Sequence, residues 1–368
     1  MNVLILSANT GQGHNSCSEA IKEVFDMHKD PCEICDALAF MSKGISNAVV
    51  KIHVGSYRKA PGAFGWGYRV SEKHPAVFGT RSPLYLFFKK GAKKLKEYIQ
   101  SGGFDTVIAC HVFAAVILTA AKKTMSGQIK TAFVATDHTR SPSLEQSSLD
   151  HYFIPDKSLA DEFVTGNITR EKLCASGIPV RRKFYMRVDK KEAKRRLGIE
   201  PENRHIIVMC GSMGCGPIEK LAAELSKRAD ACTQISIICG TNEKLERKLK
   251  AEYFGSGRIH IFGYVEDTSL FMDSADLYLT KPGGISTCEA AVKRLPMVFV
   301  NAVSGCESYN CSFFVNSGGA VTAKKVEDIA KICIELLGSE NSLCEMSAAL
   351  EETAAQNAAE VIYDVLKE

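Results

Sequence analysis

Short apolar runs of strand length alternate with segments of helical spacing along the chain. The first run, 3–8 (VLILSA), leads into a glycine-containing turn at 9–14, after which apolar residues recur at helical spacing. Three further strand candidates follow in the first half, at 106–110, 131–137 and 151–155. Such alternation predicts a parallel sheet covered by helices.

A second series of the same kind begins at 205–214, where another strand meets a glycine-rich turn. It continues with strand candidates at 234–240, 258–265, 277–284 and 297–301 and with helical segments at 217–229 and 243–253. We therefore expect an α/β protein of two doubly wound, Rossmann-like domains, at 1–180 and 181–368, with the C-terminal helix packing back on the first. Ligands of such domains bind beyond the carboxyl ends of the strands, so both glycine turns are expected to face a central cleft.

The segment between the two series, 177–204, has prolines near both ends and dense charge. It predicts the connection between the domains and a short solvated helix.

Composition narrows the class of protein. The chain has 368 residues, of which 45% are hydrophobic and 24% charged, enough apolar material for two cores and too much for a disordered chain. No apolar run approaches the ~20 residues of a membrane-spanning helix, and the N-terminus lacks a signal-peptide pattern, so we expect a cytoplasmic protein. Among the 14 cysteines only Cys32 and Cys35 form a C-x-x-C, for which a buried reduced pair and a metal or redox role are both open.

The first glycine turn carries the first candidate for catalysis. Gly13 and His14 stand where a helix begins, in a spacing that fits neither a dinucleotide fingerprint nor a Walker loop. A histidine there can accept a proton near neutral pH, although a histidine that only caps the helix is an equal alternative.

The second glycine turn, 211–217, places Gly211, Ser212 and Gly214 between a strand and a helix. Backbone N–H groups at such a helix start favour anions, which predicts a phosphate ligand; glycines needed only for the turn are the alternative.

The most informative segment is 279–290, LTKPGGISTCEA. We expect a strand that ends at Thr280, a Pro-Gly-Gly turn, and a helix capped by Ser286 or Thr287 whose N–H groups point at a phosphate. Glu289, expected in the first helical turn, can accept hydrogen bonds from the two hydroxyls of a ribose. A carboxylate that only complements the helix dipole is the alternative.

Together these motifs, with the segments IFGYVEDTSLFMDSADLYLTKPGGISTCEA and VNAVSGCESYNCSFFVNSGGA, resemble glycosyltransferase family 28. The branch of monogalactosyldiacylglycerol synthases and processive diacylglycerol glucosyltransferases is the most similar. The resemblance runs from Val3 to about Ala320. It implies a GT-B fold, a UDP-sugar donor on the C-terminal domain, an acceptor lipid on the N-terminal domain, and inversion at the anomeric carbon without an obligatory metal or cofactor.

The resemblance also implies roles for single residues. It puts the diphosphate near the 211–214 glycines, the uracil against the backbone from Phe262 through Tyr264 to Val265, and the ribose on Glu289. Amides of Gly283, Gly284, Ile285 and Ser286 would hold the phosphate. In the family a P-G-Q-E-x-x-N segment contacts the sugar; here Glu307 and Asn310 are kept, but Cys306 replaces the usual glutamine.

On the acceptor side the resemblance makes His14 the general base and Asp137 a residue that orients the acceptor or the base. A structural aspartate is the alternative for Asp137. The family follows its Thr-Asp with a histidine and then a tryptophan, whereas this chain reads HTRSPSL at 138–144. The acceptor loop therefore differs from that of its relatives.

A lipid acceptor gives meaning to a basic first half. Residues 1–186 hold 24 Lys and Arg against 16 Asp and Glu, a balance of +8, and the remainder holds 22 against 26, or −4. An apolar and lysine-rich stretch at 83–96 predicts contact with an anionic membrane, with the solvated face of a helix as the alternative. The candidates are Phe87, Phe88, Lys89, Lys90, Lys93 and Lys94, together with Trp66, for which core packing is the alternative.

The sequence thus predicts an enzyme that moves a hexose from UDP-glucose or UDP-galactose to diacylglycerol, bound peripherally to the inner face of the cell membrane. Alternatives are a glycosyltransferase of the same fold acting on another hydrophobic acceptor, and a nucleotide-sugar-binding protein without turnover. Nucleic acid is not an expected partner, because the basic residues lie beside lipid-like apolar residues and not among base-stacking aromatics.

Overall fold

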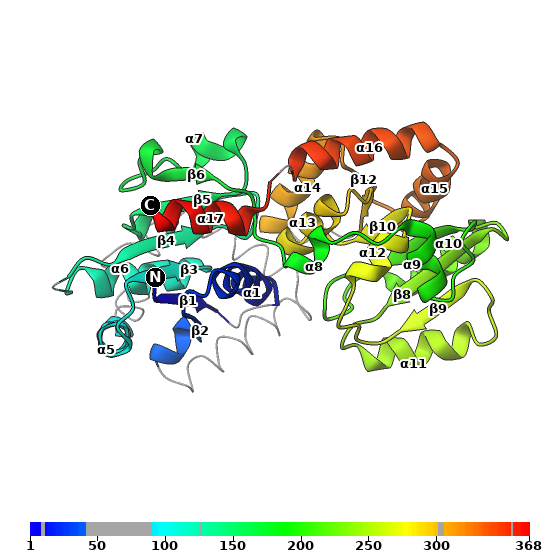
Figure 1. The fold of residues 1–368 in the computed structure, drawn as a ribbon. Helices are drawn as coiled ribbons and strands as arrows, with labels where there is room; N and C mark the ends of the chain where they lie inside the picture. The colour runs from blue at the N-terminus through cyan, green and yellow to red at the C-terminus, as the bar shows by residue number, and fades with distance from the viewer. Residues whose placement is uncertain (9–11, 42–89, 126, 301–304, 355) are drawn as a thin grey trace. The chain divides into compact units, whose positions relative to one another are not determined.

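The chain is organised as two compact units, each built on its own parallel sheet (Figure 1). The first comprises Met1–Arg181, Val303–Tyr309 and Gln356–Glu368, and the second Arg182–Ala302 and Asn310–Ala355. The computed structural model describes residues 1–8, 12–41, 90–125, 127–300, 305–354 and 356–368. Within these residues no helix is both long and apolar enough to cross a membrane.

The sheet of the first unit has the described strand order β2-β1-β3-β4-β5-β6, all parallel. Its central strands are near-continuous apolar runs, as expected for strands buried on both faces. The strands are β1 Val3–Ser7, β2 Cys32–Asp36, β3 Thr106–Ala109, β4 Lys130–Val134, β5 His151–Ile154 and β6 Leu173–Ala175.

Helices cover this sheet through apolar stripes. The helices are α1 Gln12–Met27, α5 Ala92–Gly102, α6 Val112–Lys122, α7 Ala160–Phe163 and α17 Ala358–Lys367. In α6 every residue from Ala114 to Ala121 is buried, which places this helix deep in the core.

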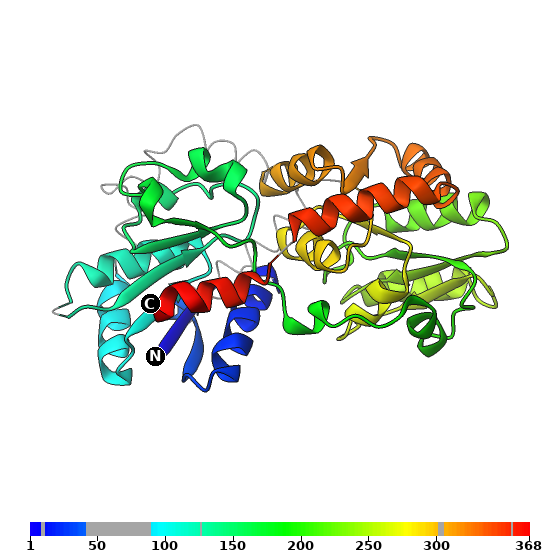
Figure 2. The same cartoon turned by 45° about the horizontal axis from the view of Figure 1, so that its top comes forward.

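The last helix, α17, packs on α1, so the two ends of the chain lie side by side (Figures 1 and 2). The ring of Tyr363 stacks on His28 with centroids 3.9 Å apart and meets Phe25 edge to face at 5.1 Å. One oxygen of Asp30 accepts from the Tyr363 hydroxyl at 3.0 Å and the other from the amino group of Met1 at 2.7 Å. Asp30 therefore ties both termini to the first unit.

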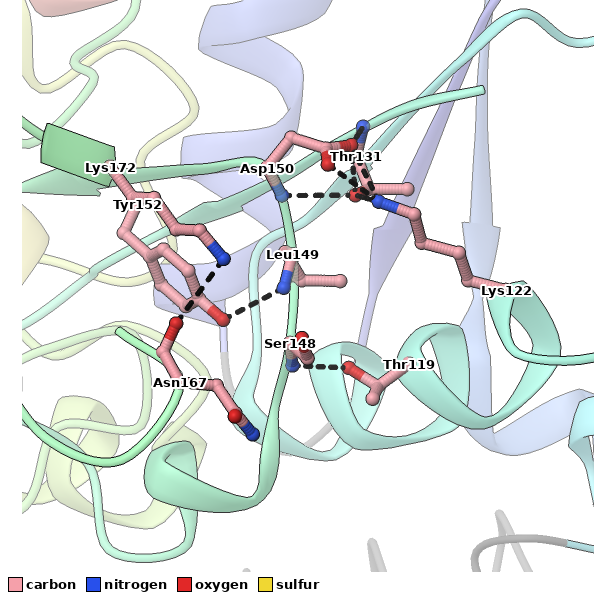
Figure 3. A network of polar contacts seen from close by, with 9 residues as sticks. All are labelled: Thr119, Lys122, Thr131, Ser148, Leu149, Asp150, Tyr152, Asn167 and Lys172. Atoms are coloured by element: carbon pink, nitrogen blue, oxygen red, sulfur yellow. Dashed lines mark hydrogen bonds and ion pairs between the residues drawn. The ribbon is translucent and has the colours of Figure 1, made fainter. Parts of the chain in front are cut away.

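A polar network closes the end of this sheet where β4 and β5 begin (Figure 3). Lys122 donates to both carboxylate oxygens of Asp150, at 2.6 and 2.7 Å, and Asp150 also accepts from the amide and hydroxyl of Thr131. Burial alone would raise the pKa of Asp150, but these hydrogen bonds with Lys122 and Thr131 lower it below its ordinary value. Lys122, Asp150 and Thr131 thus satisfy one another's hydrogen bonds at this end of the sheet. The candidate catalytic residues lie at the opposite end, beyond the carboxyl ends of the strands.

The sheet of the second unit has the order β12-β11-β10-β7-β8-β9, again all parallel. Its strands are β7 Arg204–Val208, β8 Thr233–Ile238, β9 Ile259–Phe262, β10 Leu277–Thr280, β11 Met297–Phe299 and β12 Ala320–Thr322. The helices are α8 Arg182–Tyr185, α9 Lys190–Arg196, α10 Ile218–Arg228, α11 Glu243–Glu252, α12 Ser269–Ser274, α13 Gly284–Val292, α15 Val326–Leu337 and α16 Glu340–Thr353. The helix α14, Cys306–Asn316, belongs to the first unit up to Tyr309 and to the second from Asn310.

The expectation of a solvated helix within 177–204 is wrong for one face of α9. Ala193 and Lys194 are buried, and the Lys194 ammonium lies 3.2 Å from Asp276 and donates to the carbonyl of Asn203 at 2.6 Å. A buried lysine needs such partners, because removing a charge from water without them is costly. The many charged residues of this segment predicted a helix exposed on all sides, whereas one face of α9 packs against the protein.

Candidate active site

The order of strands in each sheet marks one place where ligands are expected to bind. In the first sheet, β1 has β2 on one side and β3 on the other; in the second, β7 lies between β8 and β10. The chain connections run in opposite directions from these central strands, which leaves a crevice beyond their carboxyl ends. The glycine turns predicted to be functional follow β1 and β7, so both lie at such switch points.

His14 projects from the start of α1 toward the ends of the neighbouring strands. Its Nδ1 lies 3.0 Å from the carbonyl oxygen of Cys110, just after β3, and 3.1 Å from the hydroxyl oxygen of Thr136, just after β4. The ring of His111 meets the His14 ring edge to face, with centroids 4.6 Å apart. Three segments that are far apart in sequence thus converge on one imidazole.

The Cys110 carbonyl determines where His14 carries its proton. A carbonyl oxygen can only accept, so Nδ1 is the donor of this hydrogen bond. In the neutral ring the lone pair is then at Nε2, the nitrogen suited to take a proton from a substrate. The alternative that His14 only caps α1 gains no support from this contact, since the side chain is bonded to other strands.

The other acceptor-side candidates lie beside His14. Gly13 and Asp137 are both half-buried; Gly13 lies in the first turn of α1, and Asp137 follows Thr136 in the segment after β4. The divergent stretch that follows is tied down: the Thr139 hydroxyl and the Arg140 amide donate to one oxygen of Glu162, at 2.6 and 2.8 Å. Residues 138–140 therefore have a defined conformation of their own.

At the switch point of the second sheet, Gly211 lies against Lys281. Gly211 has φ +73°, and a Cβ placed on it would come within 2.7 Å of Cε of Lys281. The left-handed backbone favours glycine here, and a side chain at this position would displace the end of the Lys281 side chain. Lys281 is a residue that motif reasoning missed: it stands in the quoted TKPGG segment, but only the pairing of β10 with β7 brings it to the other glycine turn.

The same glycine turn also packs closely on the loop after β8. A Cβ at Gly214 would lie 2.1 Å from the carbonyl oxygen of Cys239, and one at Gly240 would lie 2.2 Å from that of Ser212. The amide of Thr241 donates to the Ser212 carbonyl at 2.8 Å. Loop packing alone therefore explains why position 214 is glycine, and a phosphate role for Gly214 and Ser212 stays a prediction.

The helix α13 begins earlier than the sequence suggested. Its N-cap is Gly283, without a side-chain cap, and the expected caps are wrong: the hydroxyls of Ser286 and Thr287 donate back to the Gly283 carbonyl at 3.2 and 2.9 Å. The predicted phosphate contacts at Gly284, Ile285 and Ser286 now form its first turn. Since Gly283 has no side chain that could cap these N–H groups, this helix end suits an anion.

Glu289 consequently lies in the second turn of α13 and not in the first. The dipole of a helix acts mainly within its first turn, so the dipole alternative loses its basis. Below the helix, Tyr278 is fully buried and its hydroxyl donates to the Met209 carbonyl at 3.3 Å. Burial, with the nearby charge of Glu289 adding to it, raises the pKa of Tyr278.

The remaining residues predicted to bind the donor differ in burial and in their contacts. Phe262 ends β9 and packs edge to face on Phe271 at 4.9 Å, whereas Tyr264 is 67% exposed. Asn310 is fully buried and its amide donates to the Pro282 carbonyl at 3.0 Å, which holds the Pro-Gly-Gly turn. Glu307 is buried in the first turn of α14.

Only part of the predicted membrane surface lies within the described residues. Trp66, Phe87, Phe88 and Lys89 fall outside them. Lys90, Lys93 and Lys94 are exposed, and the buried stripe of α5 (Ala92, Leu95, Ile99) points to the protein core. Any contact of α5 with lipid is therefore made by its charged face.

Cys32 and Cys35 are both half-buried on β2, and neither forms a disulfide. Burial raises their pKa, to about 12 for Cys32 and about 11 for Cys35. Redox and metal chemistry need the thiolate, which such values disfavour. Among the described residues there is no group of three or more His, Cys, Asp or Glu that could hold a metal.

Family models match both halves of the chain. Residues 14–180 match monogalactosyldiacylglycerol (MGDG) synthase, and residues 205–362 match the glycosyltransferase family 28 C-terminal domain. The chain belongs to glycosyltransferase family 28. A processive diacylglycerol beta-glucosyltransferase of Bacillus licheniformis is 25% identical over 377 residues, covering 100% of this chain and 95% of the relative. The branch expected from the motifs is thereby confirmed.

Solved structures share the fold of this family 28 member. MurG of Acinetobacter baumannii has a TM-score of 0.68 at 14% identity, covering 100% of this chain and 99% of that protein. The UDP-GlcNAc 2-epimerase from Neisseria meningitidis bound to UDP-GlcNAc has a TM-score of 0.64 at 13% identity, covering 100% and 99%. The predicted GT-B class is confirmed by this likeness and by the two parallel sheets.

Proposed function

We propose that this family 28 member is an inverting hexosyltransferase that moves glucose or galactose from its UDP form to the hydroxyl of diacylglycerol, giving a β-glycosyl lipid. The observation that carries the proposal is the full-length similarity to a diacylglycerol beta-glucosyltransferase in a chain whose two sheets both carry candidate groups at their switch points. The first unit takes the acceptor and the second takes the donor.

The donor site lies beyond β7 and β10. The uncapped start of α13 supplies N–H groups to the diphosphate, with the 211–214 turn beside it, and Lys281 supplies positive charge at the same place. Glu289 accepts from the ribose hydroxyls, and the backbone from Phe262 to Val265 receives the uracil. Glu307 and Asn310 complete the sugar site.

This arrangement supplies what the leaving group requires. As the bond from the anomeric carbon to the β-phosphate oxygen breaks, its electron pair passes to UDP, and negative charge grows on the diphosphate. Backbone dipoles and a lysine that are already in place stabilise that charge without reorganisation. The sugar nucleotide is a substrate, and we propose that transfer needs no metal.

On the acceptor side, His14 is the general base. Its Nε2 takes the proton of the acceptor hydroxyl while the oxygen forms a bond to the anomeric carbon from the face opposite UDP, which inverts the configuration. The Cys110 carbonyl favours the required tautomer. Asp137 orients the acceptor or the base, and Gly13 allows the acceptor to approach the backbone closely.

Diacylglycerol is a membrane lipid, so the enzyme works at a surface. We propose that the exposed lysines at and before α5 (Lys90, Lys93, Lys94) attract the anionic inner face of the cell membrane, together with Trp66, Phe87, Phe88 and Lys89. Each cation near such a surface contributes about 1 kcal/mol.

A panel of substrates tests the proposal. The purified chain is given UDP-glucose, UDP-galactose or UDP-N-acetylglucosamine with vesicles that contain diacylglycerol, another hydrophobic alcohol or neither, and UDP release is measured. The proposal expects release with one hexose donor and only when diacylglycerol is present. Release with another alcohol alone would assign a different acceptor, and UDP-hexose binding without release would make the chain a binding protein.

A further inference from the structure

A second histidine stands across the switch point from His14. His111 follows β3 and is the N-cap of α6, where its Nδ1 accepts a hydrogen bond from the amide of Phe113 at 3.0 Å. The residue before it, Cys110, supplies the carbonyl that accepts from His14 Nδ1. Two consecutive residues of one strand end therefore contact the same imidazole, one by a hydrogen bond and one by its ring.

The geometry between the two rings is that of a specific aromatic contact. Their centroids are 4.6 Å apart and their planes are inclined by 77°. Edge-to-face pairs prefer centroid separations of about 4.5–7 Å. The His111 ring also packs on Phe113, with centroids 4.7 Å apart. The ring is thus held by a cap hydrogen bond and by a neighbour of its own helix.

These contacts restrict different motions of His14. A hydrogen bond from Nδ1 to a carbonyl fixes the tautomer, but it tolerates some rotation of the ring about its Cβ–Cγ bond. A second ring placed edge to face removes this freedom, because rotation of His14 would lose the aromatic contact. A general base must point at its proton, and misplacement by about 1 Å can cost a hundredfold in rate.

We propose that His111 is a positioning residue that orients the His14 imidazole for proton transfer. The inference rests on the proposed function, since it concerns the same base. In this role His111 acts through His14 and does not itself contact the substrate. The competing explanation is that His111 is only a helix cap, for which its contact with His14 is incidental.

Two substitutions at position 111 separate these explanations. In His111→Asn the side-chain oxygen can still cap α6, since asparagine is a preferred N-cap residue, but the ring is lost. His111→Phe keeps a ring beside His14 and loses the cap. If the ring positions the base, kcat of His111→Asn falls about tenfold to a hundredfold while KM for UDP-hexose is unchanged, and His111→Phe has the higher kcat of the two.

The opposite ranking overturns the proposal: a wild-type kcat in His111→Asn, or a lower kcat in His111→Phe than in His111→Asn, means that the cap is what matters. Thermal unfolding and UDP affinity of both variants establish that each is folded.

An NMR measurement of the ring nitrogens of His14 separates the test of His111 from the test of the proposed function. It requires no turnover, and His14 signals unchanged by His111→Asn would also overturn the proposal. Absence of transfer by the wild-type enzyme, with His14 signals that do respond to His111→Asn, contradicts the proposed function alone.

Discussion

The Nδ1 of His14 and the carbonyl oxygen of Cys110 lie 3.0 Å apart, which joins the helix after β1 to the end of β3. Because the carbonyl accepts, the pair gives His14 the tautomer of a base, with its lone pair on Nε2. Backbone groups cannot be removed by substitution, so this feature is built into the fold.

The contact between Gly211 and Lys281 predicts a loss of donor binding. Gly211→Ala places a methyl group 2.7 Å from Cε of Lys281 and displaces the lysine from the diphosphate site. Loss of one charged hydrogen bond of about 1.5–3 kcal/mol weakens UDP binding by about tenfold to a hundredfold, as measured by calorimetry.

Gly198→Ala is the matched control for this change. Its φ of +70° is close to the +73° of Gly211, but no atom lies within 4 Å of the added methyl group. Both variants should lose about 1–2 kcal/mol of unfolding free energy from the left-handed backbone, whereas only Gly211→Ala should lose UDP affinity. Equal UDP affinity in the two variants would contradict the role of Lys281.

Glu289 is expected to bind the ribose hydroxyls. Binding of UDP and of 2′-deoxy-UDP to the wild type and to Glu289→Ala tests this as a double-mutant cycle. Glu289→Ala should weaken UDP binding by about tenfold or more, because a carboxylate that accepts from two hydroxyls is lost. Removing the 2′-hydroxyl should weaken binding to the wild type but have little further effect on the variant. Independent, additive losses would place Glu289 away from the ribose.

Membrane attachment through α5 predicts a salt-dependent effect of its lysines. Replacing Lys93 and Lys94 by alanine should weaken binding to anionic vesicles, measured by flotation, by about thirtyfold at low salt, at about 1 kcal/mol for each charge. The control replaces Lys324 and Lys331 of the second unit. Lys331 is matched to Lys93, since each is exposed and pairs with a glutamate four residues on. An equal loss in both double variants would show that net charge and not this surface is responsible.

Buried His205 predicts that the second unit loses stability in mild acid. Its ring nitrogens lie 3.0 and 2.9 Å from the hydroxyls of Ser274 and Ser236, and burial lowers its pKa to about 3. The unfolded chain takes up this proton below pH ~6.5 and the folded chain does not, so stability is complete above that pH and falls toward pH 3.

At pH 5 the loss should be about 2 kcal/mol relative to pH 7.5, as measured by urea unfolding. Replacing His205 by glutamine can change the unfolding free energy at every pH. It should in any case make the unfolding free energy less dependent on pH between pH 5 and pH 7.5. A slope that is the same in both proteins would mean that other groups cause it.

The central strands could be predicted from the sequence, because strands buried on two faces are continuous apolar runs, and so could the glycine turn that follows β7. The strands expected from the sequence did not include β2, β6 and β12, which are three of the four edge strands among the described residues. Edge strands have one neighbour and need less apolar surface, so the half-buried CEICD and LCA give little signal.

The contacts of the site could be predicted less well than its residues. His14 and Glu289 stand out by their motifs, but the partners of His14 come from β3 and β4, and Lys281 reaches Gly211 only through the pairing of β10 with β7. These neighbours depend on strand order, which no local pattern encodes.

The structure of the product tests whether this enzyme transfers a hexose to diacylglycerol with inversion and with His14 as the base. Purified chain is incubated with isotope-labelled UDP-hexose and diacylglycerol vesicles, and the extracted lipid is examined by NMR and mass spectrometry, with His14→Ala as the matched variant. We expect a β-linked hexosyl diacylglycerol from the wild type. We expect none from His14→Ala, although that variant should bind UDP normally. An α-linked product, or undiminished synthesis by His14→Ala, would contradict this mechanism.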